Sequence, residues 1–540
     1  MEPIVSRMYR ARFISLRRFS AKSKVVLDET TSTLFSNDEM KYRHHEGIIK
    51  PRTPDFPEWA SKEIRDILKE KHVLLKDIKA SAINLNRYLH NRRPPVEDHQ
   101  LPEKLQKVEE CLNERVTDND QKISIEDIDF RTNRKARNIL KQNVYNWQPI
   151  KFDKPTSLTY LVARSVQNYV VLYKILNEIK QRDKNFTPKT LFDFGSGFGT
   201  VMWAASEIWS NSIKEYFCVD VSEAMIELSE RLAKAAKPQI AGISYRQYFP
   251  ASMQPTYDIV VSAYSLFEMP GEMARLEAIL KLWRKTENYL IIVEEGTNAG
   301  FKLVNEARDF VLKYANSKYK TDRQPSYVFS PCPHDFKCPR FVGNDVPCSL
   351  VVRYYPLKFL DATEHKSELY SYVVLKKSKR PEDDKQWPRL VEHTLKRHRH
   401  VICRMCVASG ELKEEIFTKS KHGKHMYRCA KSTMWGDRLP LSYEQQQENP
   451  EEENPEDGTA NERTILSQRK LIRSLPKFTT RFRATPLKGL PMHRVNAYNV
   501  NIRLARNVWE EGHLKADRTL VHDQSRLYNG RENFSRCKVR

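Results

Sequence analysis

The residues whose types and spacing most clearly suggest chemistry lie between positions 191 and 200, in the sequence LFDFGSGFGT. The apolar run around Asp193 predicts a buried strand, and the helical spacing of the apolar residues after position 200 predicts a helix. Between them stand three glycines that allow a sharp turn and a close approach of the backbone to a ligand: Gly195, Gly197 and Gly199. The start of the helix offers free N–H groups to an anionic ligand.

A second acid follows about twenty residues later. The strand predicted at 215–220 ends in Asp220, whose carboxylate could accept hydrogen bonds from ribose hydroxyls. A dinucleotide fingerprint has the spacing G-x-G-x-x-G, whereas this chain has G-x-G-x-G with Asp193 before it. That pattern resembles motif I of the S-adenosylmethionine-dependent methyltransferases, which implies that the glycines line the methionine part of the donor. The alternative is a structural turn in another α/β domain.

Cysteines form the second chemically suggestive group. Three of them have the spacing C-x5-C-x9-C: Cys332, Cys338 and Cys348. A distant pair has the spacing C-x-x-C: Cys403 and Cys406. Three clustered thiolates and a remote one can make a four-thiolate site, which suits both zinc and a [4Fe–4S] cluster. The loose spacing of the first three favours the cluster, with zinc as the alternative. Incidental buried cysteines are the remaining possibility, and His334 is expected to be a turn residue.

The elements that position these residues alternate between strands and helices. This alternation predicts an α/β fold with a doubly wound, mostly parallel sheet, in which ligands bind at the carboxyl ends of the strands. The glycine loop, Asp220, 262–265 and 294–296 would then surround one crevice. The expected strands are 191–194, 215–220, 257–264 and 288–295, and the expected helices are 157–180, 201–209, 222–234, 271–285 and 299–314.

The crevice lacks a recognisable set of catalytic residues. Enzymes that methylate an exocyclic base amine carry Asn or Asp, then Pro-Pro and an aromatic residue, where this chain has SAYSLFE. Cytosine-5 methylation needs a thiolate nucleophile, and the clustered cysteines lie well beyond the last core strand. Glu268, Glu294 and Glu295 are expected to be solvated or capping residues rather than bases, so the catalytic residue is unknown. Tyr160 and Arg164, one helical turn apart, either cover the ligand or pack.

Positive charge is concentrated at the two ends of the 540-residue chain. The net charge is +23, of which residues 1–27 contribute +6 and residues 463–540 contribute +13. The Arg-rich start with interspersed apolar residues predicts a transit peptide over 1–23 and a location in the mitochondrial matrix. No apolar run reaches membrane-spanning length, so no membrane span is expected. The acidic stretch 444–462 predicts a linker, and 463–540 predicts a disordered, rRNA-binding extension.

Between these ends the sequence divides into three regions. Residues 24–150 are polar and predict an N-terminal helical region, with helices at 62–89 and 101–115. Residues 151–330 predict the methyltransferase-like domain. Residues 331–443 predict the cysteine loop and a small β-rich module, with strands at 349–355, 368–377 and 425–429. The basic run 396–400 could contact rRNA backbone, and a solvated face is the alternative.

Three features in this order resemble the methyltransferase-like protein 17 family. They are the glycine motif, the cysteine loop SPCPHDFKCPR and a late C-x-x-x-G segment at 406–410. The likeness extends over roughly residues 140–443, with further matches at 371–375 and 435–437. The family has mitochondrial and bacterial members and is associated with the small ribosomal subunit. This sequence departs from the family pattern at Pro347, where Trp is expected.

The resemblance implies a class I methyltransferase fold, an S-adenosylmethionine site and a [4Fe–4S] cluster. Carried over residue by residue, the cluster ligands would be Cys332, Cys338, Cys348 and Cys406. The donor residues would be Asp193, Gly195, Gly197, Gly199 and Asp220. The resemblance also implies a monomer that binds the immature mitochondrial small ribosomal subunit, its rRNA and proteins, and supports mitochondrial translation. Two functions stay open: a non-catalytic assembly factor, or an active rRNA methyltransferase of that subunit.

Overall fold

The structure is a computed structural model, and it describes residues 24–97, 99–113, 134–139, 147–210, 212–317, 324–343, 346–360 and 364–444. The expected transit peptide, the linker beyond residue 444 and the basic extension lie outside these ranges. Within the described ranges, no helix is long and apolar enough to cross a membrane.

Eight of the described strands form one large sheet, in the order β4-β3-β2-β5-β6-β9-β7, with β8 also paired to β9. Strands β2 to β6 run parallel, and β9 is antiparallel to β6, β7 and β8. The bounds are Thr190–Phe194 (β2), Glu215–Val219 (β3), Ile243–Arg246 (β4), Tyr257–Ala263 (β5), Thr286–Glu295 (β6), Tyr327–Ser330 (β7), Leu350–Tyr354 (β8) and Lys366–Lys376 (β9).

The strand order confirms the predicted fold class. It is the doubly wound order of class I methyltransferases, with one antiparallel strand, β9, inserted between β6 and β7. The chain leaves β2 toward β3 on one side and returns to β5 on the other, so the topological switch point lies between β2 and β5. Ligands on such sheets bind outside the carboxyl ends of the strands at this point.

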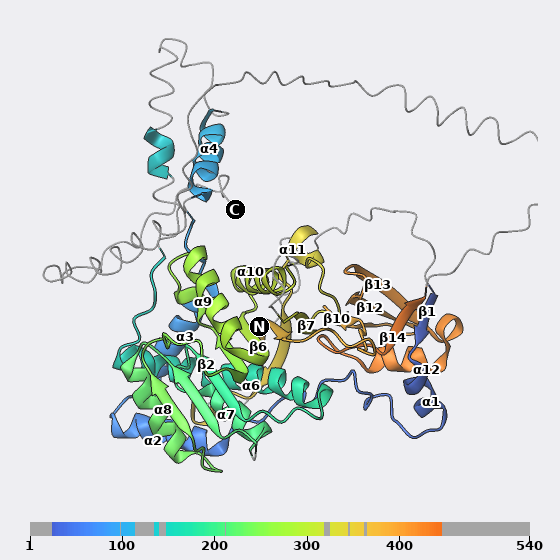
Figure 1. Cartoon of the computed structure of the whole chain (residues 1–540), viewed down its shortest axis with the longest axis horizontal. Helices are drawn as coiled ribbons and strands as arrows, with labels where there is room; N and C mark the ends of the chain where they lie inside the picture. Colours follow the sequence, from blue (N-terminus) through green and yellow to red (C-terminus); the bar gives the residue numbers. More distant parts are fainter. Residues whose placement is uncertain are drawn as a thin grey trace, which may run out of the picture. The chain divides into compact units, whose positions relative to one another are not determined.

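Helices cover both faces of the large sheet (Figure 1). On one face, α2, α3, α6, α7 and α8 share a continuous apolar core with the sheet. On the other face, α9 and α10 pack through a second apolar cluster. The bounds are Glu58–Glu70 (α2), Leu75–Asn91 (α3), Lys154–Arg182 (α6), Thr200–Ile208 (α7), Glu223–Ala235 (α8), Glu272–Lys285 (α9) and Asn298–Ala315 (α10); Gln100–Asn113 forms α4.

A third apolar core belongs to a smaller unit, here called the module. Its strands pair in the order β10-β12-β11, with β13 beside β12, and the helix α12 packs on them. The first described residues join this module, because β1 pairs with β14 and α1 contributes Phe35 to the core (Figure 1). The bounds are Lys24–Leu27 (β1), Glu29–Ser36 (α1), Arg389–Leu390 (β10), Leu395–Lys396 (β11), His400–Cys406 (β12), Leu412–Thr418 (β13), Lys419–Ser432 (α12) and Leu441–Glu444 (β14).

Three local expectations differ from the structure. The single helix expected at 62–89 is two helices, α2 and α3, separated where His72 has a φ of 51°. The expected strand 425–429 lies inside α12, because residues 426, 427, 429 and 430 are buried at helical spacing. The other two strands expected for the module are β8 and β9, which belong to the large sheet.

Candidate functional site

The glycine loop joins β2 to α7 with left-handed backbone conformations. Gly195, Gly197 and Gly199 have φ angles of 71°, 51° and 95°, a region that residues with a Cβ rarely adopt. A Cβ on Gly195 would lie 2.7 Å from the Cβ of Ser265, so only glycine lets the loop pass the end of β5. A Cβ on Gly197 would meet no atom within 4 Å, so this glycine borders open space.

Two acids flank the loop. Asp193 is fully buried, and neither of its carboxylate oxygens has a hydrogen-bond partner among the described residues. Burial raises the pKa of Asp193 well above its usual range, and the nearby Asp220 charge adds to the rise. Asp220 accepts hydrogen bonds from the backbone N–H groups of Gly197 (2.8 Å) and Ser222 (2.9 Å). The predicted donor residues therefore lie together at the ends of β2 and β3, where Asp193 keeps two buried oxygens without a partner among the described residues.

A buried polar cluster around Arg164 lies at the carboxyl ends of β5 and β6. The Arg164 guanidinium lies 2.9 Å from Glu368, 3.9 Å from Glu295 and 5.4 Å from the ring centre of Tyr264. Tyr264 follows β5, has a φ of 58° and keeps its hydroxyl buried without a partner among the described residues. Burial raises the pKa of Tyr160, one turn earlier on α6, to about 12. Tyr160 packs against the rings of Phe152 and Phe198, with 5.2 and 5.6 Å between ring centres, so Tyr160 and Arg164 are both packed at this edge of the sheet.

Two of the three glutamates near the strand ends accept hydrogen bonds from backbone N–H groups. Glu268 pairs with Arg92 at 2.5 Å and accepts a hydrogen bond from the Ile150 N–H at 2.7 Å. Glu294 accepts a hydrogen bond from the Leu266 N–H at 2.9 Å. Burial raises the pKa of Glu294 to about 8, so much of this side chain is protonated at neutral pH.

Residues 147–152, here called the strap, connect two loops at this edge of the sheet. The Trp147 indole donates to the carbonyl of Phe267, in the loop after β5, at 2.8 Å. The carbonyl of Phe152 accepts a hydrogen bond from the hydroxyl of Ser222, in the loop after β3, at 2.6 Å. The strap therefore joins the loop after β5 to the loop after β3 at the carboxyl ends of the strands.

The structure brings four of the predicted cysteines into one small pocket. Cys332 follows β7, Cys338 precedes the short helix α11 (Pro339–Gly343), Cys348 precedes β8, and Cys406 ends β12. Among the described residues, no group of three or more His, Cys, Asp or Glu side chains is arranged to hold a metal ion. The four thiols share a pocket that connects the large sheet to the module.

Strand β12 separates the two candidate fourth cysteines. Cys403 and Cys406 lie three residues apart, so their side chains point to opposite faces of the strand. Cys403 is buried in the apolar core of the module with Val401 and Met405, whereas Cys406 lines the pocket. Alternation along the strand therefore puts only Cys406 beside the other three cysteines.

The four thiols differ in their electrostatic surroundings. A hydrogen bond from Cys348 lowers the pKa of Cys338 to about 6, and the same contact, with burial, raises the pKa of Cys348 well above its usual range. Burial raises the pKa of Cys332 to about 11 and that of Cys406 well above its usual range. His334, expected as a turn residue, is buried with its Nε2 3.2 Å from the Cys406 sulfur. Ionising all four thiols requires a compensating positive charge in the pocket.

A buried ion pair holds the cysteine loop and the module against α6. Arg389 pairs with Glu178 of α6 at 2.5 Å, and their side chains are 2% and 4% exposed. Arg389 also donates to the carbonyls of Pro331 (3.0 Å) and Gly436 (2.8 Å) and to the Ser330 hydroxyl (3.1 Å). Burial opposes ionisation of Glu178, but Arg389 and a second arginine outweigh burial and lower its pKa to about 2.

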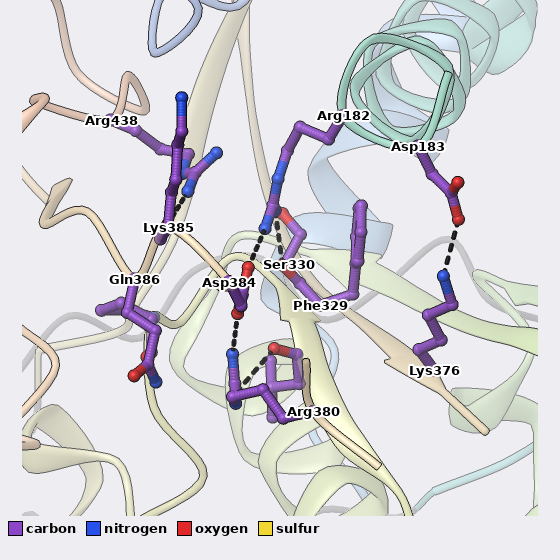
Figure 2. A network of polar contacts seen from close by, with 12 residues as sticks. Arg182, Asp183, Phe329, Ser330, Lys376, Arg380, Asp384, Lys385, Gln386 and Arg438 are labelled. Carbon is purple, nitrogen blue, oxygen red and sulfur yellow. Dashed lines mark hydrogen bonds and ion pairs between the residues drawn. The ribbon is translucent and has the colours of Figure 1, made fainter. Parts of the chain in front are cut away.

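Figure 2 shows the neighbouring part of this network, beside β7. Arg182, at the end of α6, donates to the carbonyl of Phe329 at 2.5 Å and lies 3.8 Å from Asp384. Arg380 pairs with the same carboxylate at 2.5 Å and donates to the carbonyl of Val328 at 3.1 Å. Two arginines, one from α6 and one from the segment after β9, thus hold the backbone that leads to Cys332.

The strand order, the glycine loop and the position of Asp220 define a class I methyltransferase-like protein. A family model described as mitochondrial small ribosomal subunit Rsm22 matches residues 154–440, which is more than half of the 540 residues. The chain belongs to this Rsm22 family.

Individual relatives agree with the family match. The human protein "Ribosome assembly protein METTL17, mitochondrial" is 38% identical over 361 residues, covering 66% of this chain and 77% of its own length. The Saccharomyces cerevisiae protein "Ribosome assembly protein RSM22, mitochondrial" is 22% identical over 421 residues, covering 52% of this chain and 66% of its own length. The predicted relationship to the methyltransferase-like protein 17 family is thereby confirmed. A solved S-adenosylmethionine-dependent methyltransferase from Aquifex aeolicus aligns with 42% of this chain and 100% of its own, at 14% identity and a TM-score of 0.27.

Several residues that hold the loop after β5 and the cysteine loop carry no signal in the sequence. Arg92 and Trp147 come from the polar N-terminal region, to which the sequence assigns no chemistry. Arg389 comes from a stretch without a motif. The contacts of Arg92 with Glu268 and of Arg389 with Glu178 span 176 and 211 residues of sequence, so no local pattern could have indicated them.

Proposed function

We propose that this protein is a mitochondrial ribosome assembly factor that binds the immature small subunit and its rRNA, and does not methylate them. Membership in the Rsm22 family supports the ribosomal part, since two relatives carry the name ribosome assembly protein. The observation that carries the non-catalytic part is the cluster of Arg164, Glu295 and Glu368 beside Tyr264. These side chains are paired with one another at the strand ends. An acceptor would have to approach a bound donor at the same place.

The donor site is proposed to bind S-adenosylmethionine as a structural ligand. Asp193, the three glycines of the loop and Asp220 would hold it, because they supply open space beside Gly197 and buried acceptor oxygens without partners. The donor brings a sulfonium-activated methyl group. A ligand that binds only the folded chain raises its stability by mass action, without any chemical step.

The cysteine pocket is proposed to hold a [4Fe–4S] cluster, with zinc as the alternative. The donor set suits it, because four sulfurs line one pocket and cysteine thiolates are the ligands of such clusters. Cys332, Cys338, Cys348 and Cys406 would be the ligands. A bound cluster would join the ends of β7, β8 and β12, and so lock the module onto the large sheet.

The remaining parts of the proposal concern location and contact. The segment 1–23 would direct the protein to the mitochondrial matrix. The basic run 396–400 and the extension 463–540 would contact rRNA phosphates, with an affinity that falls as salt rises. The protein would act as a monomer on the particle.

Two variants that place Asn at a positive φ test whether donor chemistry is needed. Gly197→Asn places a side chain in the open space beside the loop, at a φ that Asn tolerates better than most residues. His72→Asn is the control, because it places the same side chain at the same φ of 51° in the exposed turn between α2 and α3, outside the glycine loop. Each variant is expressed in cells depleted of the protein. Donor binding is measured by calorimetry, small-subunit assembly on sucrose gradients, and rRNA methylation by mass spectrometry.

We expect Gly197→Asn to lose donor binding. The pattern of rRNA methylation should be the same in depleted cells, in cells with the wild type and in cells with the variant. Subunit assembly should then fall only as far as the lower stability of the donor-free protein explains. Additional stabilising substitutions in the Gly197→Asn protein should restore assembly. Loss of one specific rRNA methyl group with the variant, together with failed assembly in every background, would instead identify an active rRNA methyltransferase.

A further inference from the structure

Three buried arginines surround the cysteine pocket, and they are not equivalent. Arg308, Arg340 and Arg389 are 3%, 6% and 2% exposed. Arg389 is balanced by the buried carboxylate of Glu178 at 2.5 Å. Arg340 is balanced by Glu392 at 2.7 Å and donates to the Pro347 carbonyl. These two therefore have partners within the fold whether or not the cysteines are loaded.

Arg308, on α10, is less completely satisfied. Its Nη2 donates to the carbonyls of His334 (3.3 Å) and Phe336 (2.6 Å), which lie between the first two cysteines of the pocket. Its carboxylate partner, Asp309, is the adjacent residue on the helix, and that side chain is 37% exposed. Its Nε is buried without a hydrogen-bond partner among the described residues. A buried N–H donor without a hydrogen-bond acceptor lowers the stability of the fold, unless a bound group supplies the acceptor.

The backbone that Arg308 binds lies between two of the proposed ligands. His334 stands two residues after Cys332, and Phe336 stands two residues before Cys338, so the position of both cysteines depends on where this backbone is held. Cys332 also packs against the apolar cluster that α10 forms with the sheet. Four thiolates around an iron–sulfur core leave a net negative charge, and nearby charge and hydrogen bonds to sulfur set the stability and potential of such a centre.

We propose that Arg308 is the positioning residue of the loaded cysteine site. Its guanidinium clamps the 334–336 backbone onto α10 and places a positive charge beside the loop that carries two of the proposed ligands. This inference rests on the proposed cluster. It makes α10, a helix of the methyltransferase-like core, part of the cluster's surroundings, so retention of the cluster depends on the core being folded.

The test compares three variants of the full chain, purified without oxygen. Arg308→Gln removes the charge, and Arg308→Lys keeps the charge but loses the planar fork. Arg275→Gln is the matched control, because Arg275 is a 6%-exposed arginine side chain on α9 that pairs with Glu97 and Glu306 instead. Iron and sulfide content, the midpoint potential of the cluster and the rate of iron release to a chelator are measured for each.

Arg308→Gln should release iron roughly tenfold faster than the wild type, in the range found for partners of metal ligands. Its midpoint potential should shift to more negative values, because the reduced cluster carries more negative charge and loses its neighbouring cation. Arg308→Lys should keep most of the potential but release iron faster. Arg275→Gln should match the wild type in both.

Two different failures can be told apart. If the wild type holds iron, and Arg308→Gln matches it and Arg275→Gln in release rate and potential, the role of Arg308 is wrong and the cluster stands. If the wild type itself carries no iron, the cluster assignment fails, and the inference about Arg308 fails with it. Should Arg308→Gln not fold, an Arg308→Lys protein that releases iron at the wild-type rate would equally overturn the proposal.

Discussion

Buried polar groups are paired differently in the region beside the glycine loop, here called the crevice, and in the pocket of four cysteines. In the crevice, charged side chains pair with one another: Arg164 with Glu368, and Arg92 with Glu268. In the pocket, burial holds the pKa of Cys332 and Cys406 above the usual range, and the Arg308 Nε has no partner among the described residues. The charged side chains of the first region are balanced within the fold, whereas ionising the four thiols of the second requires an added positive charge.

This difference bears on the proposal of a binding function for this methyltransferase-like fold. A methyltransferase needs an open path to the donor and groups that act on the acceptor. In this chain the strap joins the loops after β3 and β5, and the Arg164 side chain is paired with Glu368. Near the other end of α6, Glu178 and Arg389 support the cysteine loop.

The largest expected effect comes from breaking the support of the cysteine pocket. Glu178→Gln leaves Arg389 buried without a counter-charge, which should lower the free energy of unfolding by about 3–5 kcal/mol. Guanidinium unfolding of the full chain, followed by tryptophan fluorescence, measures this loss. Lys107→Ala is the control, because Lys107 forms an exposed i,i+4 pair with Glu103 that is worth only about 0.3–0.5 kcal/mol. Equal effects of the two substitutions would mean that the buried pair does not hold the module.

A pH measurement probes the crevice. Burial raises the pKa of Glu294 to about 8 from 4.5, so the carboxyl is protonated in the folded chain while it is ionised in the unfolded one. Its stabilising contribution is complete below about pH 4.5 and is lost as the pH rises to about 8. Glu294→Gln should remove this slope and stabilise the protein at pH 8 by on the order of 2–4 kcal/mol. The exposed Glu287 of the same strand supplies the control, Glu287→Gln. A slope that survives in Glu294→Gln would refute the assignment.

The smallest expected effect concerns the strap. Ser222→Ala removes the hydrogen bond to the Phe152 carbonyl and the cap on the Met225 N–H, which together should cost about 1–2 kcal/mol. Limited proteolysis should then cut the strap faster. Ser206→Ala is the control, because that hydroxyl bonds only to the Trp203 carbonyl of its own helix and its loss should cost about 0.5 kcal/mol or less. A strap cut at the same rate in both variants would show that Ser222 does not hold it.

Local patterns were sufficient for the parts of the fold that are built from neighbouring residues. The strand, glycine turn and helix at 190–208 are predicted from one stretch, and the structure has them there. The spacing of Cys403 and Cys406 could not choose between them, because the choice depends on which face of β12 meets the large sheet. Likewise, β8 and β9 read as strands, but only long-range pairing assigns them to the large sheet.

The most direct test of the account is the iron content of two cysteine variants. Full-length Cys406→Ser and Cys403→Ser proteins are purified without oxygen and compared with the wild type for iron, sulfide and zinc. The account predicts about four irons per chain in the wild type and in Cys403→Ser, and loss of the cluster in Cys406→Ser, because only Cys406 lines the pocket. Iron retained in Cys406→Ser, or a colourless wild type with stoichiometric zinc, would contradict it.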